Sequence, residues 1–432
     1  MSQVRDLFFD EFYDELENVI KGIETTQDEP GTPPLLADEV ERHWNPYQPD
    51  PDNRQGVLIS VDGGVQISNF AYGGLVTVAR ACALTHHPGQ GRNLTKKVKI
   101  HIQETHDNRD RAFIPGYART IAEYTAATQA AQHALDQNLK PTVLLDGSLY
   151  LARFPYAIRE YRHHPTLIQE LLTSIAELRT LAHQHGFPVA AVAKDSTVFY
   201  LHMQLLRRAI NRAGHHKLLA YLKDATTPLN LSIKADTLNP QDRKLLETYI
   251  DPRPLCDTHL VHTCTNTEGY TTPLLLAPSI YYARGDAPAL YTRIRRNVTE
   301  PTAGNVIASL EAFFGLPGVA TTYWRPQPSA RPFRIDLTAH TLGHPEPWGR
   351  KKGNTLLEPG WDPKPLRGVL DHLGHWYCND VEYNIPLKQA DILARFDRNL
   401  YKRKYEPYII RRLEQAGIDI AGTRRNLREM EA

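Results

Sequence analysis

The sequence predicts an α/β fold in which a mixed β-sheet is flanked by helices, with helical and loop insertions. Two apolar runs of strand length carry this prediction, VLISVDGG over Val57–Gly64 and PTVLLDGSLY over Pro141–Tyr150. Each run leads into Asp-Gly, a pattern typical of a buried strand that enters a turn. Long segments of helical periodicity separate the later strands, and this alternation is typical of a sheet covered by helices.

The composition is that of a soluble globular protein. The chain has 432 residues, of which 41% are hydrophobic and 23% charged, enough for one large or two ordinary domains. A formal net charge of +1 excludes a protein that coats DNA through its overall charge, but it leaves a local basic groove open. No apolar run approaches the roughly 18 residues that cross a bilayer, and the N-terminus lacks a signal-peptide pattern. We therefore expect a cytoplasmic protein with no membrane partner.

The cysteines and histidines do not predict a zinc site. The four cysteines are scattered without a C-x-x-C pair, so we expect neither a thiolate zinc site nor a disulfide framework. Three histidine doublets lie beside Pro or Gly or at predicted helix ends, and we interpret them as solvated or capping residues rather than metal ligands.

The N-terminal segment predicts a helix set apart from the core. Val4–Ile23 has an apolar stripe of 3.6-residue period opposite acidic residues, which predicts an amphipathic helix. Thr25–Asn53 is rich in Pro and Asp and predicts a long loop. Such a helix either docks on a partner or second subunit or packs on its own core, and the sequence favours neither. We assign residues 1–53 to this region, as a dimer or partner contact.

The core elements follow in an informative order. The segment after Val57–Gly64 is β-rich and broken at Gly73-Gly74, which predicts a hairpin, and Lys96–Thr105 alternates like a third, half-exposed strand. The next elements are a helix over Tyr117–Leu135, a strand over Pro141–Tyr150 and a helix over Leu167–His185 that is capped by Gly186. A strand over Pro188–Ala193 and a helix over Thr197–Ala213 follow. This order is that of a ribonuclease-H-like mixed sheet, while an actin-like ATPase core is the second fold that opens with such a strand and hairpin.

Beyond Gly214 the pattern is weaker. We interpret residues 214–256 as an insertion and assign 54–408 to the main domain and 409–432 to a basic tail, which suits a phosphate backbone, an acidic partner or a solvated helix face. The remaining predicted strands are Thr258–Thr265, Pro273–Ala277 and Ala289–Arg293, followed by a short helix over Val306–Phe314. We then predict an extended segment over Arg331–Leu337 that contains Asp336, a loop over Thr338–Pro363 and a last helix over Tyr383–Leu400.

Two strand-end carboxylates, Asp62 and Asp146, are the main candidates for chemistry. An ionised carboxylate near a core costs several kcal/mol unless a cation or donor compensates it. If the sheet closes as predicted, Glu123 and Asp391 from two helices can join them in one cleft. Hard oxygen ligands without Cys or spaced His suit Mn2+ or Mg2+, and two such ions about 3.5–4 Å apart activate water for phosphodiester cleavage.

Two neighbouring residues have plainer explanations as well. On helical spacing alone, Arg119 and Glu123 form an ordinary i,i+4 ion pair. Lys194, at the end of a third strand, either lies on the surface or places a point charge on the phosphate.

The ordered set of motifs resembles the NurA nuclease family. These motifs are VDGG, the helix with R-x-x-x-E, LLDGSL, AVAKDS, RPFRIDL and the terminal EYNIPLKQAD. The resemblance covers about Val57 to Tyr408 plus the leading helix. It implies a ribonuclease-H-like fold, a homodimer, Mn2+-dependent nuclease action on DNA and partnership with the hexameric HerA ATPase, which drives DNA to the nuclease during end resection. Asp62, Glu123 and Asp146 match the family's acidic metal ligands.

The last motif departs from the family pattern. Tyr383 lies where the family has Tyr-Pro, but Asn384 follows it and the proline comes later, at Pro386. The family then has Ala-His where this chain has Ala390-Asp391. We interpret Asp391 as a working substitution, because other ribonuclease-H-like enzymes use an Asp on the last helix.

The sequence thus favours a metal-dependent DNA nuclease, a 5′–3′ exonuclease and/or single-strand endonuclease in end resection or repair. One alternative is a non-catalytic subunit of this family that binds HerA or DNA, for which Asp391 and the altered Tyr383 motif would be signs of decay. An actin-like ATPase is less favoured, because a helical segment rather than a second hairpin follows Asp146.

Overall fold

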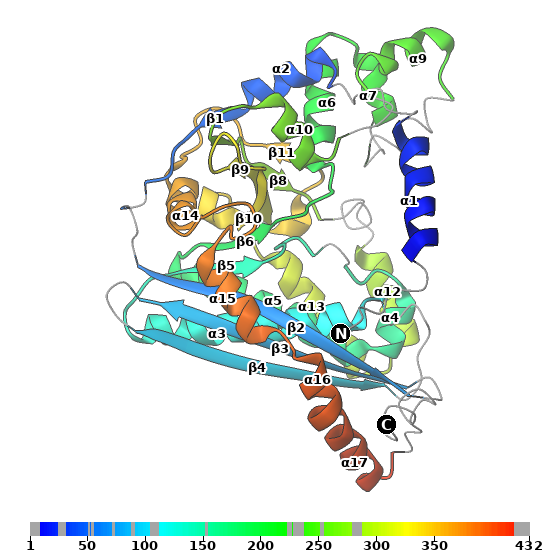
Figure 1. The fold of residues 1–432 in the computed structure, drawn as a ribbon, viewed down its shortest axis with the longest axis vertical. Coiled ribbons are helices and arrows are strands. Elements are labelled where there is room, and N and C mark those ends of the chain that lie inside the picture. The colour runs from blue at the N-terminus through cyan, green and yellow to red at the C-terminus, as the bar shows by residue number, and fades with distance from the viewer. Residues whose placement is uncertain are drawn as a thin grey trace. The chain divides into compact units, whose positions relative to one another are not determined.

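The computed structural model describes residues 9–24, 32–50, 52, 56–70, 74–87, 91–103, 112–151, 154–222, 227, 237–250, 255–278 and 287–418. The chain forms two compact units (Figure 1). Unit 1 consists of Met1–Arg42 and Thr197–Thr265, and unit 2 of His43–Ser196 and Asn266–Ala432. Within the described ranges, no helix is both long enough and apolar enough to cross a membrane.

One mixed sheet forms the centre of unit 2. Its strands pair in the order β1-β7-β9-β10-β6-β5-β2-β3-β4, and β8 pairs with β9 and β11 beside this path. The strands are β1 (Trp44–Pro46), β2 (Val57–Asn69), β3 (Leu75–His86), β4 (Arg92–Gln103), β5 (Pro141–Asp146), β6 (Val189–Ala193), β7 (Gly269–Thr271), β8 (Leu274–Leu276), β9 (Val319–Arg325), β10 (Phe333–Thr338) and β11 (Thr355–Leu356).

Five strands reproduce the predicted ribonuclease-H-like topology. The strands β2, β3 and β4 are antiparallel neighbours, whereas β5 pairs parallel to β2 and β6 parallel to β5. The two parallel pairs require helical crossovers, and α3 (Ile114–Asp136) and α5 (Pro165–His185) lie in these connections. The spatial order β4-β3-β2-β5-β6 confirms the predicted mixed α/β sheet.

Helices cover both faces of this sheet (Figure 1). The helix α3 packs on β2, β3, β4 and α5, and α13 packs on α5. Ala118, Ala122 and Ala126 on α3 are buried, and their small side chains let the helix lie close to the strands. The helix α15 crosses β2 and β3. The other helices of unit 2 are α4 (Ile158–His163), α12 (Ala287–Asn297), α13 (Thr302–Gly315), α14 (Lys364–His375), α15 (Ile385–Ala394), α16 (Arg398–Leu400) and α17 (Glu406–Gln415).

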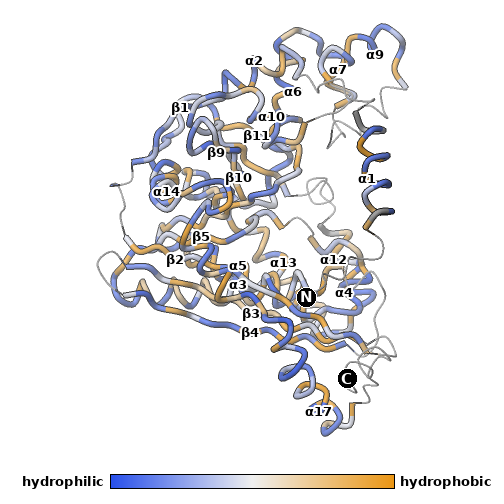
Figure 2. The backbone as a smooth tube through the Cα atoms, viewed as in Figure 1, coloured by the Kyte–Doolittle hydropathy of each residue, from blue (hydrophilic) through white to orange (hydrophobic). Residues whose placement is uncertain are grey.

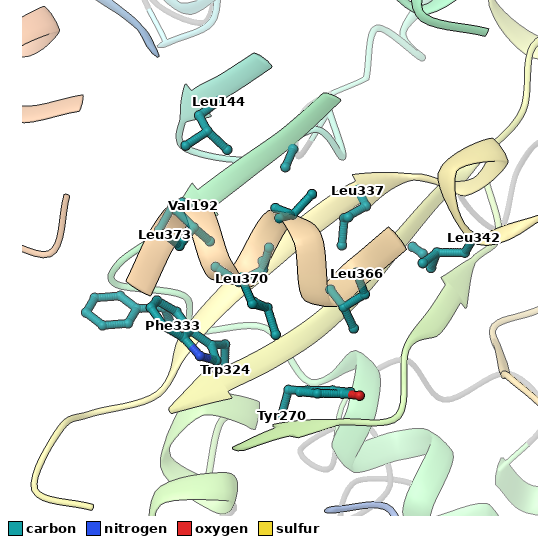
Figure 3. Close-up of a cluster of buried hydrophobic side chains, with 14 of the residues drawn as sticks. Leu144, Val192, Tyr270, Trp324, Phe333, Leu337, Leu342, Leu366, Leu370 and Leu373 are labelled. Atoms are coloured by element: carbon teal, nitrogen blue, oxygen red, sulfur yellow. The ribbon is translucent and has the colours of Figure 1, made fainter. Parts of the chain in front are cut away.

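One large core of unit 2 lies under α14. Leu366, Leu370 and Leu373 recur at helical spacing and pack against Val192, Leu337 and Trp324 of the sheet (Figure 3). Burying a leucine side chain contributes about 1.5–3 kcal/mol, so this contact fixes α14 over β6, β9 and β10. The apolar stripe of α14 was present in the sequence but was not recognised there.

Unit 1 is helical in its described part. It contains α1 (Phe9–Glu24), α2 (Pro34–Arg42), α6 (Tyr200–Arg212), α7 (His216–Leu222), α9 (Pro240–Glu247) and α10 (Asp257–Cys264). Its core includes Met203, Leu206 and Leu246. The buried Asp257 carboxylate accepts hydrogen bonds from the Leu201 and His202 amides at 2.9 and 2.7 Å, which satisfies backbone donors at the start of α6.

Most predicted elements are confirmed, with boundaries moved by a few residues. The first helix is observed from Phe9, and the earlier part of Val4–Ile23 lies outside the described residues. The loop predicted over Thr25–Asn53 is wrong where α2 buries Leu36 and Val40 at helical spacing. The division of the chain at residues 53, 214–256 and 408 stays a prediction.

Three further predictions are wrong because tertiary packing outweighs local β-propensity or helical pattern. Thr258–Thr265 is the helix α10, which buries Leu260 and Val261 on one face, and Ala289–Arg293 belongs to α12. The single helix predicted over Tyr383–Leu400 ends at Ala394, where the backbone becomes extended, before the short α16. The buried strand β9 was not predicted at all.

Candidate active site

Asp62 and Asp146 lie side by side on neighbouring strands. In the parallel pair of β2 and β5, Val61 is opposite Leu145, so the next residue of each strand is the aspartate. Neighbouring strands lie about 4.8 Å apart. The strand β5 ends at Asp146, next to Val192 of β6. Two carboxylates far apart in the sequence therefore meet at one level of the sheet.

The turn predicted at Gly63-Gly64 is wrong, because β2 continues through both glycines to Asn69. Asp62 therefore lies within the strand rather than at its end. A Cβ at Gly63 would lie 2.7 Å from Oε1 of Glu123, and one at Gly64 would lie 2.7 Å from the Ala394 carbonyl oxygen. Glycine within a strand often marks a close approach of this kind. The two glycines admit α3 from one side and the end of α15 from the other.

Glu123 is buried against Gly63, the residue that follows Asp62. Its side chain is 8% exposed, and its Oε1 lies 3.3 Å from Nε of Arg119, whose side chain is 46% exposed. The i,i+4 pair suggested by the sequence is thus present, but its acidic end is inside the protein. Despite this proximity, Oε1 accepts no hydrogen bond of acceptable geometry. A buried carboxylate oxygen without a hydrogen bond is costly unless it has another partner.

Lys194 and Tyr383 adjoin Asp146. Nζ of Lys194 donates to Oδ2 of Asp146 at 2.8 Å and lies 4.3 Å from the centre of the Tyr383 ring. Burial and the charge of Asp146 raise the pKa of the Tyr383 hydroxyl, which therefore stays protonated. On α15, Asp391 pairs with Arg395 one turn later. Lys194 thus contacts both Asp146 and Tyr383, while the charges of Asp146 and Asp391 act on Asp62 and those of Asp62 and Asp146 act on Glu123.

The site carries an excess of negative charge. Burial raises the pKa of Asp62 to about 7, and the charges of Asp146 and Asp391 add to the rise. Burial raises the pKa of Glu123 to about 8, with Arg119 opposing and Asp62 and Asp146 adding to the rise. Mutual repulsion of this kind is what a divalent cation removes.

The donor set fits a hard divalent cation, since all the acidic donors are carboxylate oxygens. The side chains are not already grouped around one point: among the described residues, no three His, Cys, Asp or Glu side chains are placed to hold a metal ion together. Asp146, Asp391 and Glu123 instead contact Lys194, Arg395 and Arg119. The described structure shows no such basic partner for Asp62. The residue types and their positions on the strands therefore suit a divalent ion. In this structure, however, Asp146, Asp391 and Glu123 are paired with Lys or Arg side chains.

The raised pKa values predict that the metal-free protein loses stability as the pH rises. The ordinary pKa values are 3.8 for Asp62 and 4.5 for Glu123, so the folded state binds more protons than the unfolded state. This contribution is complete below about pH 4 and is lost as the pH rises through the folded-state pKa values of about 7 and about 8. In EDTA we expect the melting temperature to fall by several degrees between about pH 5.5 and 8.5. The fall should be smaller in Asp62→Asn, and equal falls in both proteins would contradict this origin.

A buried ion pair behind Asp146 was not assigned a role from the sequence. Arg334 donates to Oδ1 and Oδ2 of Asp336, each at 2.9 Å. Oδ2 also accepts from Oγ of Ser148 at 2.7 Å and from the Leu149 amide at 3.1 Å. The pair therefore holds the segment that follows Asp146. The sequence offered two signals: both residues lie in the motif RPFRIDL, and their i,i+2 spacing places both side chains on one face of a strand.

The chain was compared with protein families and with known proteins. A family model described as "NurA domain" matches residues 56–343. The solved NurA nuclease from Sulfolobus solfataricus is 13% identical, with 94% of this chain and 98% of that chain covered and a TM-score of 0.48. A structure described as NurA bound to dAMP and manganese is 11% identical, with 92% and 96% covered and a TM-score of 0.41. No protein in the curated set matches this chain.

Proposed function

The chain belongs to the NurA family, since the family's domain model matches residues 56–343, and from this premise we propose that it is a metal-dependent DNA nuclease. One observation carries the proposal. Asp62 and Asp146 lie level on two neighbouring parallel strands, and Glu123 is buried against Gly63, the residue that follows Asp62. A group of buried carboxylates does not stabilise a core by itself, and its negative charge costs free energy unless a cation compensates it. Membership of the NurA family by itself supports a nuclease.

The cofactor that we propose is Mn2+ or Mg2+, as two ions held by Asp62, Glu123, Asp146 and Asp391. Two similar structures are described as containing manganese, and all four ligands offer oxygen. When bound, such ions supply an activated water and stabilise the leaving oxygen of a phosphodiester.

The remaining residues act on the substrate and on the carboxylates. Lys194 can exchange its contact with Asp146 for one with a phosphate oxygen, where an ammonium acts as a point charge. Tyr383 keeps its proton at neutral pH, so its hydroxyl can donate a hydrogen bond to an oxygen but cannot act as a base. Arg119 contacts Glu123 and opposes the rise in the pKa of its carboxyl group, and Arg395 contacts Asp391.

The test is a digestion of plasmid and end-labelled oligonucleotides with Mn2+, with Mg2+ and with EDTA. We expect cleavage that depends on the divalent ion, and the labelled ends report 5′–3′ exonuclease or single-strand endonuclease action. DNA that stays intact with either ion would favour the second candidate, a non-catalytic family member that binds DNA or a HerA-type motor. The pairing of Asp391 with Arg395 is the observation in favour of that candidate. Repeating the digestion with a HerA-type hexameric ATPase tests the role in end resection that we propose for the nuclease.

Gly63→Ala is expected to lower the rate of cleavage about 10–100-fold, a loss typical when a group that orients metal ligands is disturbed. The added Cβ would lie 2.7 Å from Oε1 and 2.8 Å from Cγ of Glu123, so this carboxylate must move. Gly116→Ala, on the same helix as Glu123 and with no atom within 4 Å of its new Cβ, is the matched control. The control should keep full activity. Equal activity of the two variants would show that the position of Glu123 does not matter.

We also propose that α1 contacts a second copy of the chain or a HerA-type motor. Phe12 and Leu16 lie one turn apart and are 64% and 42% exposed, on a helix with acidic residues on its other side. An exposed apolar stripe of this kind is typical of an interaction site. We expect Phe12→Asp with Leu16→Asp to weaken dimerisation or motor binding at least about tenfold, as measured by analytical ultracentrifugation and by titration with the motor. Glu15→Ala is the control, and unchanged association of the double variant would exclude this role.

A further inference from the structure

The chain that follows α15 carries a second polar surface outside the cluster of carboxylates. Tyr401–Tyr405 forms one wide helical turn that continues into α17, and we call residues 401–415 the C-terminal arm. Its inner side is fixed to the sheet, because Tyr401 and Leu413 are buried with Val76 and Val78 of β3. Figure 1 shows α17 continuing from α16 near β3 and β4, and Figure 2 shows hydrophobic and hydrophilic stretches along it. The arm is therefore anchored on one side and has a second side free of the core.

The outer side of the arm combines exposed tyrosines with basic residues. Tyr405 is 47% and Tyr408 63% exposed, and the Tyr401 and Tyr405 rings are stacked with their centres 6.3 Å apart. Lys404 and Arg411 lie four residues before and three after Tyr408, so they share its face. The arm holds five basic and two acidic residues. Tyr408 is thus exposed between two cations on one face of the arm.

Among the described residues, the basic side chains on this face have no acidic partner. Arg403, Lys404 and Arg411 are exposed, and in the part of the chain that the structure describes no carboxylate forms an ion pair with any of them. An anionic ligand can therefore approach them without first displacing an acidic side chain.

The strand β2 connects the arm to the candidate active site. Asp62, Gly64 and Ser68 lie on the same face of β2, because side chains alternate along a strand. Gly64 contacts the end of α15, and Oγ of Ser68 is 3.0 Å from the Tyr401 hydroxyl. Six residues of strand separate Asp62 from this last contact, which is about 20 Å. That length spans at most about six nucleotides, since each strand of a duplex advances about 3.4 Å per phosphate and an unstacked single strand advances farther.

We propose that the C-terminal arm binds single-stranded DNA within about six nucleotides of the bond that is cut. This inference rests on the proposed nuclease function. The rings of Tyr405 and Tyr408 stack on unpaired bases, while Arg403, Lys404 and Arg411 contact the phosphates. Interleaved aromatic and basic side chains suit a single strand, since each unpaired base offers a ring face whereas the bases of a duplex are already stacked on one another.

The test is fluorescence anisotropy in EDTA, so that binding is measured without cleavage, using labelled oligo(dT) of 4 and 16 nucleotides. Tyr405→Ala with Tyr408→Ala should bind the 16-mer at least about tenfold more weakly than the wild type, as loss of base stacking predicts. The 4-mer is too short to reach the arm and should show no change. Tyr405→Phe with Tyr408→Phe keeps both rings and should bind like the wild type, which also controls for folding of the arm.

A second variant tests the phosphate contacts. Replacing Arg403, Lys404 and Arg411 by Gln should reduce the slope of log affinity for the 16-mer against log salt by about two, the value for three phosphate contacts on a single strand. Arg243→Gln, an exposed arginine on α9, should leave the slope unchanged.

Three outcomes would overturn the inference. These are unchanged binding of the 16-mer by the alanine variant, equal losses for the 4-mer and the 16-mer, and a loss of binding to a protein partner with DNA binding intact. Hydrolysis of bis(p-nitrophenyl) phosphate with Mn2+ separates this result from the proposed function, because so small a substrate cannot reach the arm. A wild type that cannot hydrolyse this ester or any oligonucleotide would refute the nuclease assignment. An arm variant that hydrolyses it normally but binds the 16-mer weakly would support the arm.

Discussion

Replacing Asp62 or Asp146 by Asn is expected to reduce Mn2+-dependent cleavage of DNA by more than about a hundredfold. The change keeps the volume of the side chain but removes a charge that the ions need, and even groups behind metal ligands contribute 10–100-fold. The rate of digestion of a labelled oligonucleotide measures the loss. Full activity in either variant would exclude the residue as a ligand and, with it, the placement of the ions between β2 and β5.

The same substitution should not weaken the fold. Because burial and neighbouring carboxylates raise the pKa of Asp62, its ionised form is unfavourable in the metal-free protein, and Asn removes that cost. We therefore expect the melting temperature of Asp62→Asn in EDTA at about pH 8.5 to equal or exceed that of the wild type. Asp136→Asn, at the exposed end of α3, is the matched control and should keep both activity and melting temperature.

Asp336→Ala is expected to lower the free energy of unfolding by about 3–5 kcal/mol, the loss typical of a broken buried ion pair. Asp336 is fully buried, and the substitution leaves the Arg334 guanidinium inside the protein without its carboxylate. The Ser148 hydroxyl and the Leu149 amide lose an acceptor as well. Urea titration of the metal-free protein measures the change. The urea concentration at the midpoint of unfolding should fall clearly.

A double variant separates the ion pair from its surroundings. Arg334→Met with Asp336→Leu removes both charges and keeps an apolar filling, so it should lose less stability than Asp336→Ala alone. If the single variant loses under about 1 kcal/mol, the pair does not stabilise the segment after Asp146. If the double variant is the less stable one, the hydrogen bonds to that segment matter more than the charges.

The order of elements in the sequence predicted the most important contact of the fold. A strand, a hairpin, a helix and a second strand place β5 beside β2, and the Asp-Gly pattern at each strand identified Asp62 and Asp146. The sequence did not reveal the function of Gly63 and Gly64, because Asp-Gly-Gly is favourable in turns. Only the positions of Glu123 and of Ala394, far along the chain, show that these glycines lie within a strand.

The second half of the sheet was harder to predict for a physical reason. The strand β9 is buried on both faces, so its sequence, VATTYWR, lacks the alternation of apolar and polar residues that identifies a half-buried strand. The helix α10 contains β-branched residues, yet it buries Leu260 and Val261 on one side. Its conformation depends on contacts within unit 1, where the buried Asp257 binds the start of α6.

The single face of β2 that carries Asp62, Gly64 and Ser68 also limits how the chain can change in length. Inserting one residue between Gly64 and Ser68 would turn the Ser68 side chain to the opposite side of the sheet and separate it from Tyr401. Only insertions of two residues preserve the pattern, and each pair lengthens the strand by about 7 Å. Relatives that differ here should therefore differ in steps of two residues, and the distance from Asp62 to the arm should grow by about 7 Å at each step.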